Sequence, residues 1–404
     1  MKKLALGIIL ISICSCNSKH EENSAVESAP MILEEIRFPG NRASEPNLTV
    51  GPDGTIYLSW IEDQNDNSTL KYARLNNGNW VSETQIASGA NWFVNWADFP
   101  SMIALESGYA AHFLAYISEG KYSYGVNLAS SKTGKDWNNP VMAHDDNTPT
   151  EHGFVTLLPM SRENYLAVWL DGRNYVDSEH KPATKEMSLR CGLFDLDGNK
   201  LEEHVIDSRV CDCCQTDGAI SSRGPVIVYR DRGLMEVRDI FISRFENGEW
   251  KEPWIVHPDE WEIPGCPVNG PAVDASGSNI SVAWFTAARG TRKVLVSFSG
   301  NDGDQFGEPV RIDLGNPLGR VDLIQFDNFT AVTWMEENGE TAFIYCRKIF
   351  RDGTLGEVIP INETDKSRSS GFPRMTRDKE SLIFAWTVPG EVSTIQTVKG
   401  NFTD

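Results

Sequence analysis

The sequence is poor in basic residues and has no apolar run long enough to cross a membrane. Its 37 lysines and arginines face 57 aspartates and glutamates, which gives a formal net charge of -20. This acidic balance excludes the basic face that nucleic-acid binding needs and argues against charge-driven docking on anionic lipid. The apolar run over 4–13 is too short to span a bilayer. We therefore expect no nucleic-acid partner and no transmembrane helix.

The N-terminal segment has the pattern of an export signal. Two lysines precede the apolar run, which ends in Ile-Cys-Ser-Cys at 13–16. This resembles a bacterial lipobox, and the small residue before Cys16 favours it over Cys14 as the lipidated first residue of the mature protein. An ordinary secretory signal is the alternative. We thus expect a signal peptide over 1–15, a flexible tether over 16–31 and an acyl anchor such as palmitate, which would place the protein at a bacterial envelope membrane, the outer membrane in our reading.

A short apolar segment that usually ends in Trp or Tyr returns about every 50 to 60 residues. It occurs at 56–60, 113–116, 167–169, 226–229, 281–284, 331–334 and 382–386. Asp-Gly and Asn-Gly pairs between the segments indicate hairpin turns, because they accept positive φ. A fixed period with several strands per unit predicts a β-propeller. We therefore expect an all-β fold, one propeller over 32–404 with seven four-stranded blades; six blades are the alternative.

The last repeat lacks its fourth strand. The chain stops after the strand expected over 392–399, whereas an extra strand, expected over 32–38, precedes the first repeat. Filling the gap with that strand would remove exposed sheet edges and join the two ends of the ring. We therefore expect the N-terminal strand to complete the seventh blade.

The least repetitive loops should surround the mouth of the central channel. In a propeller, the loops that enter each innermost strand and the loops between the second and third strands open on one face. Loops that depart from the repeat on such a face usually carry binding. These loops are expected at 95–100, 151–154, 169–173, 211–217, 229–232, 236–239, 265–271 and 289–292.

Four cysteines fall in two neighbouring loops of this face. Cys211, Cys213 and Cys214 lie in one loop. Cys266 lies in the equivalent loop of the next blade, and His152 lies one blade earlier. Thiolates with an imidazole suit copper(I) or zinc. Disulfides are the alternative for an exported protein, and free thiols are the third possibility.

Charged residues from three successive blades form a second candidate site. Several guanidiniums near one point can bind a carboxylate or phosphate through paired hydrogen bonds, and a neighbouring carboxyl can act as a general acid. The predicted substrate-binding residues are Arg173, Arg230, Arg232, Arg238 and Arg289, and the predicted catalytic residues are Asp171, Asp231 and Glu236. An internal salt-bridge network along the channel is the alternative.

Two turns resemble the Asp-box, Ser-x-Asp-x-Gly-x-x-Trp. They span 299–306, with Asn301 at the Asp position, and 130–137, with Lys132 there. With arginines and aspartates expected at the channel mouth, these turns make the chain resemble the sialidase superfamily. The Ile-Arg-Phe-Pro segment at 36–39 echoes an N-terminal Arg-x-Pro element of that family.

The resemblance implies a glycan-directed hydrolase. Sialidases are six-bladed propellers that hold a sugar carboxylate with three arginines and use a tyrosine, a glutamate and an aspartate in catalysis. Tyr175 and Tyr229 are the candidates for the tyrosine. The present chain departs from the family in its seven repeats and in its cysteine-rich loop.

Three functions follow as hypotheses. The first is a cell-envelope protein that binds or hydrolyses an acidic glycan at the channel mouth. The second is an envelope protein that binds copper or zinc through the cysteines and His152. The third is a non-catalytic scaffold that presents its surface to partners.

Overall fold

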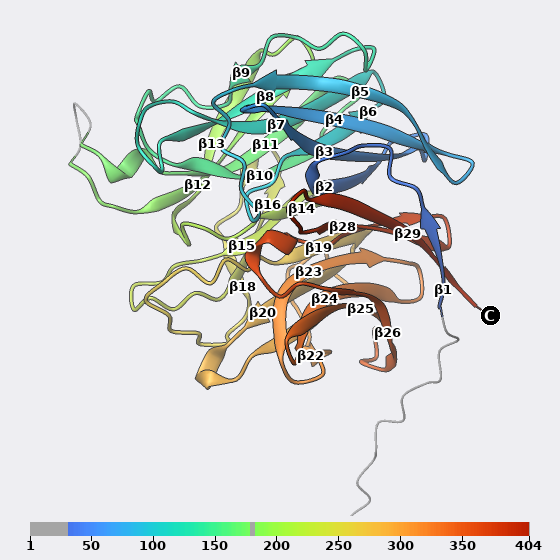
Figure 1. The fold of residues 1–404 in the computed structure, drawn as a ribbon. Coiled ribbons are helices and arrows are strands. Elements are labelled where there is room, and N and C mark those ends of the chain that lie inside the picture. The colour runs from blue at the N-terminus through green and yellow to red at the C-terminus, as the bar shows by residue number, and fades with distance from the viewer. Residues whose placement is uncertain (1–30, 178–181, 404) are drawn as a thin grey trace, which may run out of the picture.

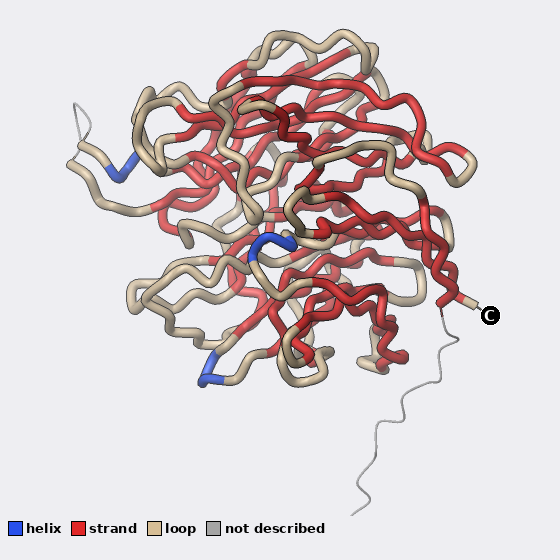
Figure 2. The backbone as a smooth tube through the Cα atoms, viewed as in Figure 1, coloured by secondary structure: helices blue, strands red, loops and turns tan. Residues whose placement is uncertain are grey.

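Seven antiparallel sheets surround a common axis in the computed structural model, which describes residues 31–177 and 182–403. Figure 1 shows the sheets arranged in chain order around that axis. Figure 2 shows that the backbone consists of strands and loops, with only short helical turns among the described residues. The predicted seven-bladed propeller is confirmed. The described helices are three 3-10 turns, and none of them is long or apolar enough to cross a membrane. The predicted signal peptide and Cys16 lie outside the described residues.

Each blade runs outward from an innermost strand. Blade 1 comprises β2 (Ala43–Val50), β3 (Ile56–Gln64), β4 (Asn67–Asn76) and β5 (Asn79–Gly89). Blade 2 comprises β6 (Ser101–Leu105), β7 (Gly108–Tyr116), β8 (Tyr124–Ser131) and β9 (Val141–Met142). Blade 3 comprises β10 (His152–Pro159), β11 (Asn164–Asp171), β12 (Met187–Asp195) and β13 (Lys200–Val210). Blade 4 comprises β14 (Asp217–Ser221), β15 (Gly224–Arg230), β16 (Ile240–Glu246) and the short β17 (Glu249–Trp250) and β18 (Trp254–His257).

The remaining blades follow the same plan. Blade 5 comprises β19 (Ala272–Ser276), β20 (Asn279–Thr286), β21 (Lys293–Ser299) and β22 (Val310–Arg311). Blade 6 comprises β23 (Pro317–Gln325), β24 (Thr330–Asn338), β25 (Thr341–Ile349) and β26 (Leu355–Thr364). Blade 7 comprises β27 (Arg374–Asp378), β28 (Ser381–Val388), β29 (Thr394–Phe402) and β1 (Met31–Ile36). The helical turns are η1 (Arg173–Tyr175), η2 (Ala288–Gly290) and η3 (Arg368–Ser370).

The ring is closed by β1, which pairs antiparallel with β29, as predicted. In Figure 1 the two strands lie side by side. The buried hydroxyl of Thr397 on β29 donates to the carbonyl of Ile36 at 2.6 Å and accepts the indole N–H of Trp80 at 2.9 Å. One side chain thus ties the last blade, the closing strand and the first blade together.

Buried tryptophans of the second strands form the repeated core. Those fully buried are Trp60, Trp169, Trp284, Trp334 and Trp386. In three blades the indole N–H donates to a carboxylate two residues further on, and the pairs are Trp60 with Glu62 (3.0 Å), Trp169 with Asp171 (2.8 Å) and Trp334 with Glu336 (2.8 Å). Since the same contact recurs in blades 1 and 6, Asp171 makes a structural contact of the repeat.

Carboxylates on the inner strands join successive blades along the channel. Asp217, Asp274 and Asp322 each accept a backbone N–H from the next blade. Their donors are Val273 (2.8 Å), Gln325 (2.8 Å) and Met375 (2.7 Å). Burial raises the pKa of Asp217 to about 7. These channel carboxyls are therefore engaged in holding the blades together.

We predict that Thr397→Val destabilises the protein by about 2 to 4 kcal/mol, because it leaves a buried indole N–H and a buried carbonyl without partners at nearly constant volume. Denaturant unfolding followed by fluorescence measures the change. Thr84→Val removes a hydroxyl hydrogen bond on an exposed strand and serves as the control, with an expected effect within about 0.5 kcal/mol. Equal effects of the two substitutions would contradict the closure role of Thr397.

Candidate functional site

The channel mouth is crossed by side chains on the face where the loops enter the innermost strands, here called the upper face. The amide of Gln215 donates to the carbonyl of Ala97 at 2.6 Å and accepts the backbone N–H of Gly270 at 2.9 Å. The ring of Trp96 stacks on Phe372, with centroids 5.6 Å apart. The sequence placed the site at the channel mouth. Ala97, Gln215, Gly270 and Phe372 also line a channel hollow of about 380 Å³.

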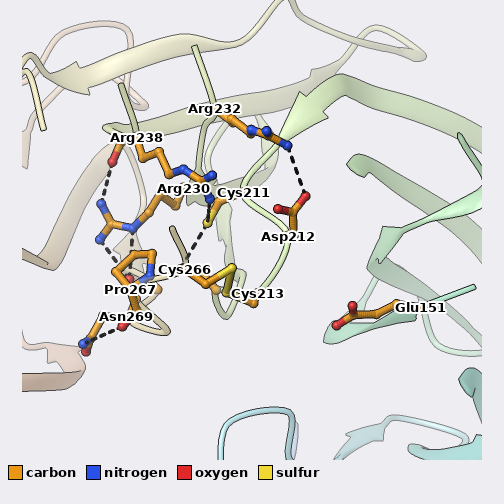
Figure 3. Close-up of a disulfide and its surroundings, with 12 residues drawn as sticks. Glu151, Cys211, Asp212, Cys213, Arg230, Arg232, Arg238, Cys266, Pro267 and Asn269 are labelled. Carbon is orange, nitrogen blue, oxygen red and sulfur yellow. Dashed lines mark hydrogen bonds and ion pairs between the residues drawn. A yellow bond between two sulfur atoms is a disulfide. The ribbon is translucent and has the colours of Figure 1, made fainter. Parts of the chain in front are cut away.

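The predicted cysteines do converge beside this mouth (Figure 3). Cys213 and Cys266 form a disulfide that joins the loops before blades 4 and 5. The sulfur of Cys211 lies within 4.8 Å of both bridged sulfurs, and it is hydrogen-bonded to Cys214 at 3.6 Å. Of the alternatives left open by the sequence, the structure combines two: one disulfide and two buried free thiols. While bridged, Cys213 and Cys266 offer no thiolates to copper or zinc.

His152 does not join the cysteines, which corrects its predicted grouping. Its Nε2 lies 3.2 Å from a carboxylate oxygen of Asp146 and 3.6 Å from one of Asp171. Its ring stacks on His144 with centroids 3.6 Å apart and planes within 2° of parallel. Because an ion must lie near the plane of each coordinating imidazole, two stacked parallel rings cannot bind the same ion in this geometry. The side chains of this buried cluster thus contact one another and form a polar network within the protein.

The surroundings of the two free thiols of the cysteine loop shift their pKa values in opposite directions. The hydrogen bond with Cys214, together with the charges of Arg238 and Arg230, lowers the pKa of Cys211 to about 6. A guanidinium nitrogen of Arg238 lies 3.1 Å from the Cys211 sulfur. Burial raises the pKa of Cys214 well above its usual range. Cys211 is therefore the thiolate of the pair.

Arg230 is buried and holds the loops of the upper face together. Its guanidinium donates to the carbonyls of Asn269 at 2.8 Å, Arg238 at 2.7 Å and Phe285 at 2.8 Å. It also lies over the ring of Trp261, 4.9 Å from the centroid. Because all of these partners belong to the protein and the side chain is 1% exposed, Arg230 is not presented to a ligand.

Glu236 clamps two of the predicted arginines. Its carboxylate accepts from Arg232 at 2.9 Å and from Arg238 at 2.8 Å. The hydrogen bonds from Arg232 and Arg238 lower the pKa of Glu236 to about 2. A carboxyl with this pKa is ionised at neutral pH, so it is poorly suited to the proton-donor role that the sequence suggested.

The other predicted residues lie in separate groups. Arg173 makes two hydrogen bonds of 2.7 Å to Asp171, beside the His152 cluster. Arg289 is exposed and pairs with Glu260 at 2.8 Å. Burial raises the pKa of Asp231, near the Cys211 loop, to about 7. The structure thus brings the cysteines together with Arg230, Arg232, Arg238 and Glu236, and places Asp171, Arg173 and Arg289 elsewhere.

Next to the sulfur cluster, a hollow of about 300 Å³ opens between the loops of blades 2 to 4. It is lined by Gly120, Tyr122, Ser123, Pro149, Thr150, Glu151, Tyr175, Met187 and Asp212. Tyr122 is 57% exposed, and the hydroxyl of Tyr175 donates to Asp212 at 2.8 Å. Sequence reasoning missed Tyr122, Glu151 and Asp212 as site residues. Glu151 and Asp212 lie in loops that it had assigned to this face, but no motif marks them.

The two carboxyl groups of this hollow have different environments. Glu151 accepts the hydroxyl of Tyr124 at 2.5 Å, and burial raises the pKa of Glu151 to about 7, with the charge of Asp212 adding to the effect. Asp212 is held by Tyr175 and lies 3.6 Å from Arg232. Figure 3 shows Glu151 and Asp212 on separate loops, with Asp212 beside Arg232. A carboxyl that keeps its proton near neutral pH beside a second, differently held carboxylate is an arrangement suited to acid-assisted bond cleavage.

Two further tyrosines, Tyr124 and Tyr229, are buried. Tyr124 is 1% exposed, and burial raises its pKa well above the usual range. Tyr229, a predicted nucleophile candidate, is also buried and donates to Asp207 at 2.6 Å. Tyr124 therefore positions Glu151, and Tyr229 belongs to the core.

Comparison with known proteins identifies the fold and no family. No protein-family model matches the chain. No curated protein matches it. The phage phi92 endosialidase is similar with a TM-score of 0.54 and 8% identity, over 93% of this chain and 70% of that one. A protein of unknown function from Dyadobacter fermentans (TM-score 0.48, 13% identity, 94% and 99% covered) and an α-L-arabinanase from Penicillium chrysogenum (0.46, 11%, 93% and 98%) also align.

We predict that digestion of the unreduced, alkylated protein with a protease that cleaves before aspartate yields the Cys213–Cys266 peptide pair, because cleavage before Asp212 separates Cys211 from Cys213. Replacing both bridged cysteines with alanine should lower the free energy of unfolding by about 2 to 4 kcal/mol, since the bridge spans 53 residues. Cys346→Ala, a buried cysteine outside the cluster, leaves the bridge in place and is the mapping control. Four alkylated loop cysteines in the unreduced protein would contradict the assignment.

Proposed function

We propose that this propeller binds a glycan in the 300 Å³ hollow of its upper face and hydrolyses a glycosidic bond there. The observation that carries the proposal is that Glu151 and Asp212 line one hollow, together with the exposed residues Tyr122 and Tyr175. The volume suits a small sugar unit. The similar solved structure that is named an endosialidase supports a glycan ligand for this fold.

In the proposed mechanism Glu151 is the general acid. Its pKa of about 7 keeps a proton on the carboxyl near neutral pH, and the hydrogen bond from Tyr124 fixes its orientation. The proton passes to the oxygen of the leaving sugar as the glycosidic bond breaks. A water molecule attacks the anomeric carbon and replaces the leaving sugar. Asp212, oriented by Tyr175 and Arg232, acts as the general base that accepts the proton of this water.

An acidic glycan, the ligand expected from the sequence, stays a prediction. Arg232 is the predicted arginine next to the hollow, through its contact with Asp212. It is already held by Glu236, so an acidic sugar would have to compete for that guanidinium. Neutral and sialylated glycosides should therefore be assayed side by side.

We predict that Glu151→Gln lowers kcat by about 100-fold or more while glycan binding persists, because the amide keeps the shape and cannot donate the proton. Tyr175→Ala should raise Kd about tenfold, since it removes a ring and the partner of Asp212. Fluorogenic glycosides measure the change in kcat, and calorimetry measures the change in Kd.

The wild-type rate should fall as the pH rises through about 7, where Glu151 loses its proton.

Leu234→Ala is the control, because Leu234 is 86% exposed and does not line the hollow. Its kinetics should equal those of the wild type. The hydrolase proposal is abandoned if the wild-type protein cleaves no glycoside in a panel of arabinosides and sialosides. Glycan binding at this hollow is abandoned if Tyr175→Ala binds as the wild type does.

We propose further that the chain is held at a bacterial envelope membrane by acylation of Cys16. The lipobox-like sequence at 13–16 supports this. Cys16→Ala should move the protein from the detergent phase to the aqueous phase of a Triton X-114 partition, because a single exported domain without acyl chains is not retained by lipid. Cys14→Ala should remain in the detergent phase. Identical partitioning of the two variants would exclude acylation at Cys16.

A further inference from the structure

Two disulfide sulfurs and one free thiol sulfur lie close together on the upper face. Cys213 and Cys266 form the disulfide, and the sulfur of Cys211 lies within 4.8 Å of both. We propose that this cluster is a thiol–disulfide exchange site, in which an external thiol enters at Cys266 and Cys211 is the internal resolving thiol. The site does not use the carboxyls of the glycan hollow, so it stands independently of the proposed hydrolysis.

The surroundings of Cys211 favour the nucleophilic form of its sulfur. The groups that face it are the guanidiniums of Arg238, at 3.1 Å, and Arg230, and the thiol of Cys214, at 3.6 Å. Positive charge and a hydrogen bond at a thiol both stabilise its thiolate. Glu236 holds Arg238 in place from its other side at 2.8 Å. A thiolate is therefore fixed next to a disulfide, the partner with which thiolates react.

Exposure decides where an external thiol enters. Cys266 is exposed and Cys213 is half-buried, whereas Cys211 and Cys214 are buried. An incoming thiolate therefore meets the sulfur of Cys266 first. The free cysteines of the strands β12 and β25, Cys191 and Cys346, are buried, and burial raises the pKa of each to about 12. They are accordingly expected to stay inert.

The exchange balances without any outside oxidant. A thiolate attacks the sulfur of Cys266, the bond to Cys213 breaks, and Cys213 leaves as a thiolate that takes up a proton. The thiolate of Cys211 then attacks the same sulfur of Cys266 and expels the external thiolate. The products are a Cys211–Cys266 disulfide and a Cys213 thiol. The proton on Cys213 comes from the solvent, the external thiolate is regenerated, and no net oxidation has occurred.

The test is a pulse of reduced glutathione, followed by acid quenching, alkylation and digestion before aspartate. In the wild type we expect the Cys211–Cys266 pair to appear, with Cys213 alkylated. In Cys211→Ser we expect glutathione to stay on Cys266 at a level about tenfold higher, because a neighbouring thiol acts at a far greater effective concentration than a free one. Cys346→Ala should behave as the wild type.

Near-ultraviolet circular dichroism shows whether Cys211→Ser folds. If it does not fold, a second variant tests whether Cys211 is the resolving thiol. Arg238→Gln keeps all four sulfurs and removes the charge at Cys211. Its resolving step should be several-fold slower at pH 7, and the midpoint of its pH profile should rise from about 6 toward the usual thiol value. The initial attack at Cys266 should keep its rate.

The same chemistry is available to a low-mass thiol and to a thiol of an exported polypeptide. Reduced glutathione and a reduced, unfolded protein are therefore compared as the entering thiol, and the faster of the two assigns the source. The proposal is overturned if neither reagent yields a Cys211–Cys266 bridge. It is also overturned if Cys211→Ser and the wild type carry equal amounts of glutathione, or if Arg238→Gln resolves at the wild-type rate.

Discussion

The pairing of β1 with β29 is the constraint on which the rest of the structure depends. It converts a row of seven sheets into a ring, so that the loops entering the innermost strands share one face. The hydroxyl of Thr397 reinforces the closure by hydrogen bonding to Ile36 and Trp80, which lie in two other parts of the chain. Inside the ring, the inner-strand aspartates accept N–H groups of the next blade and fix each blade to its neighbour. The sulfur cluster and the hollow exist because this frame brings their loops together.

The propeller could be predicted from the sequence because its signal is local and repeated. Apolar segments ending in an aromatic residue mark the second strand of each blade, and turn residues mark its boundaries. The repeated spacing Trp-x-Asp/Glu was also present, at 60–62, 169–171 and 334–336, and it could have identified Asp171 as a structural acceptor. The convergence of Cys213 and Cys266 followed from the order of the blades alone.

The details of the upper face could not be predicted, because contacts between distant loops determine them. Gln215 donates at the channel mouth to the carbonyl of Ala97, which lies 118 residues away in sequence. The sequence shows Arg230 and Arg232 as equivalent members of a charged loop. In the structure one is buried among carbonyls and the other is partly exposed beside Asp212. One loop, 211–214, thus contributes to both the hollow and the sulfur cluster.

Native-state hydrogen exchange measured by mass spectrometry tests the ring closure most directly. If β1 completes the seventh blade, the amides of 31–36 that face β29 and the amides of 394–402 are protected from exchange, because they open only when the ring opens. Rapid exchange of 31–36, with slow exchange in the other blades, would show an open ring and would contradict the account.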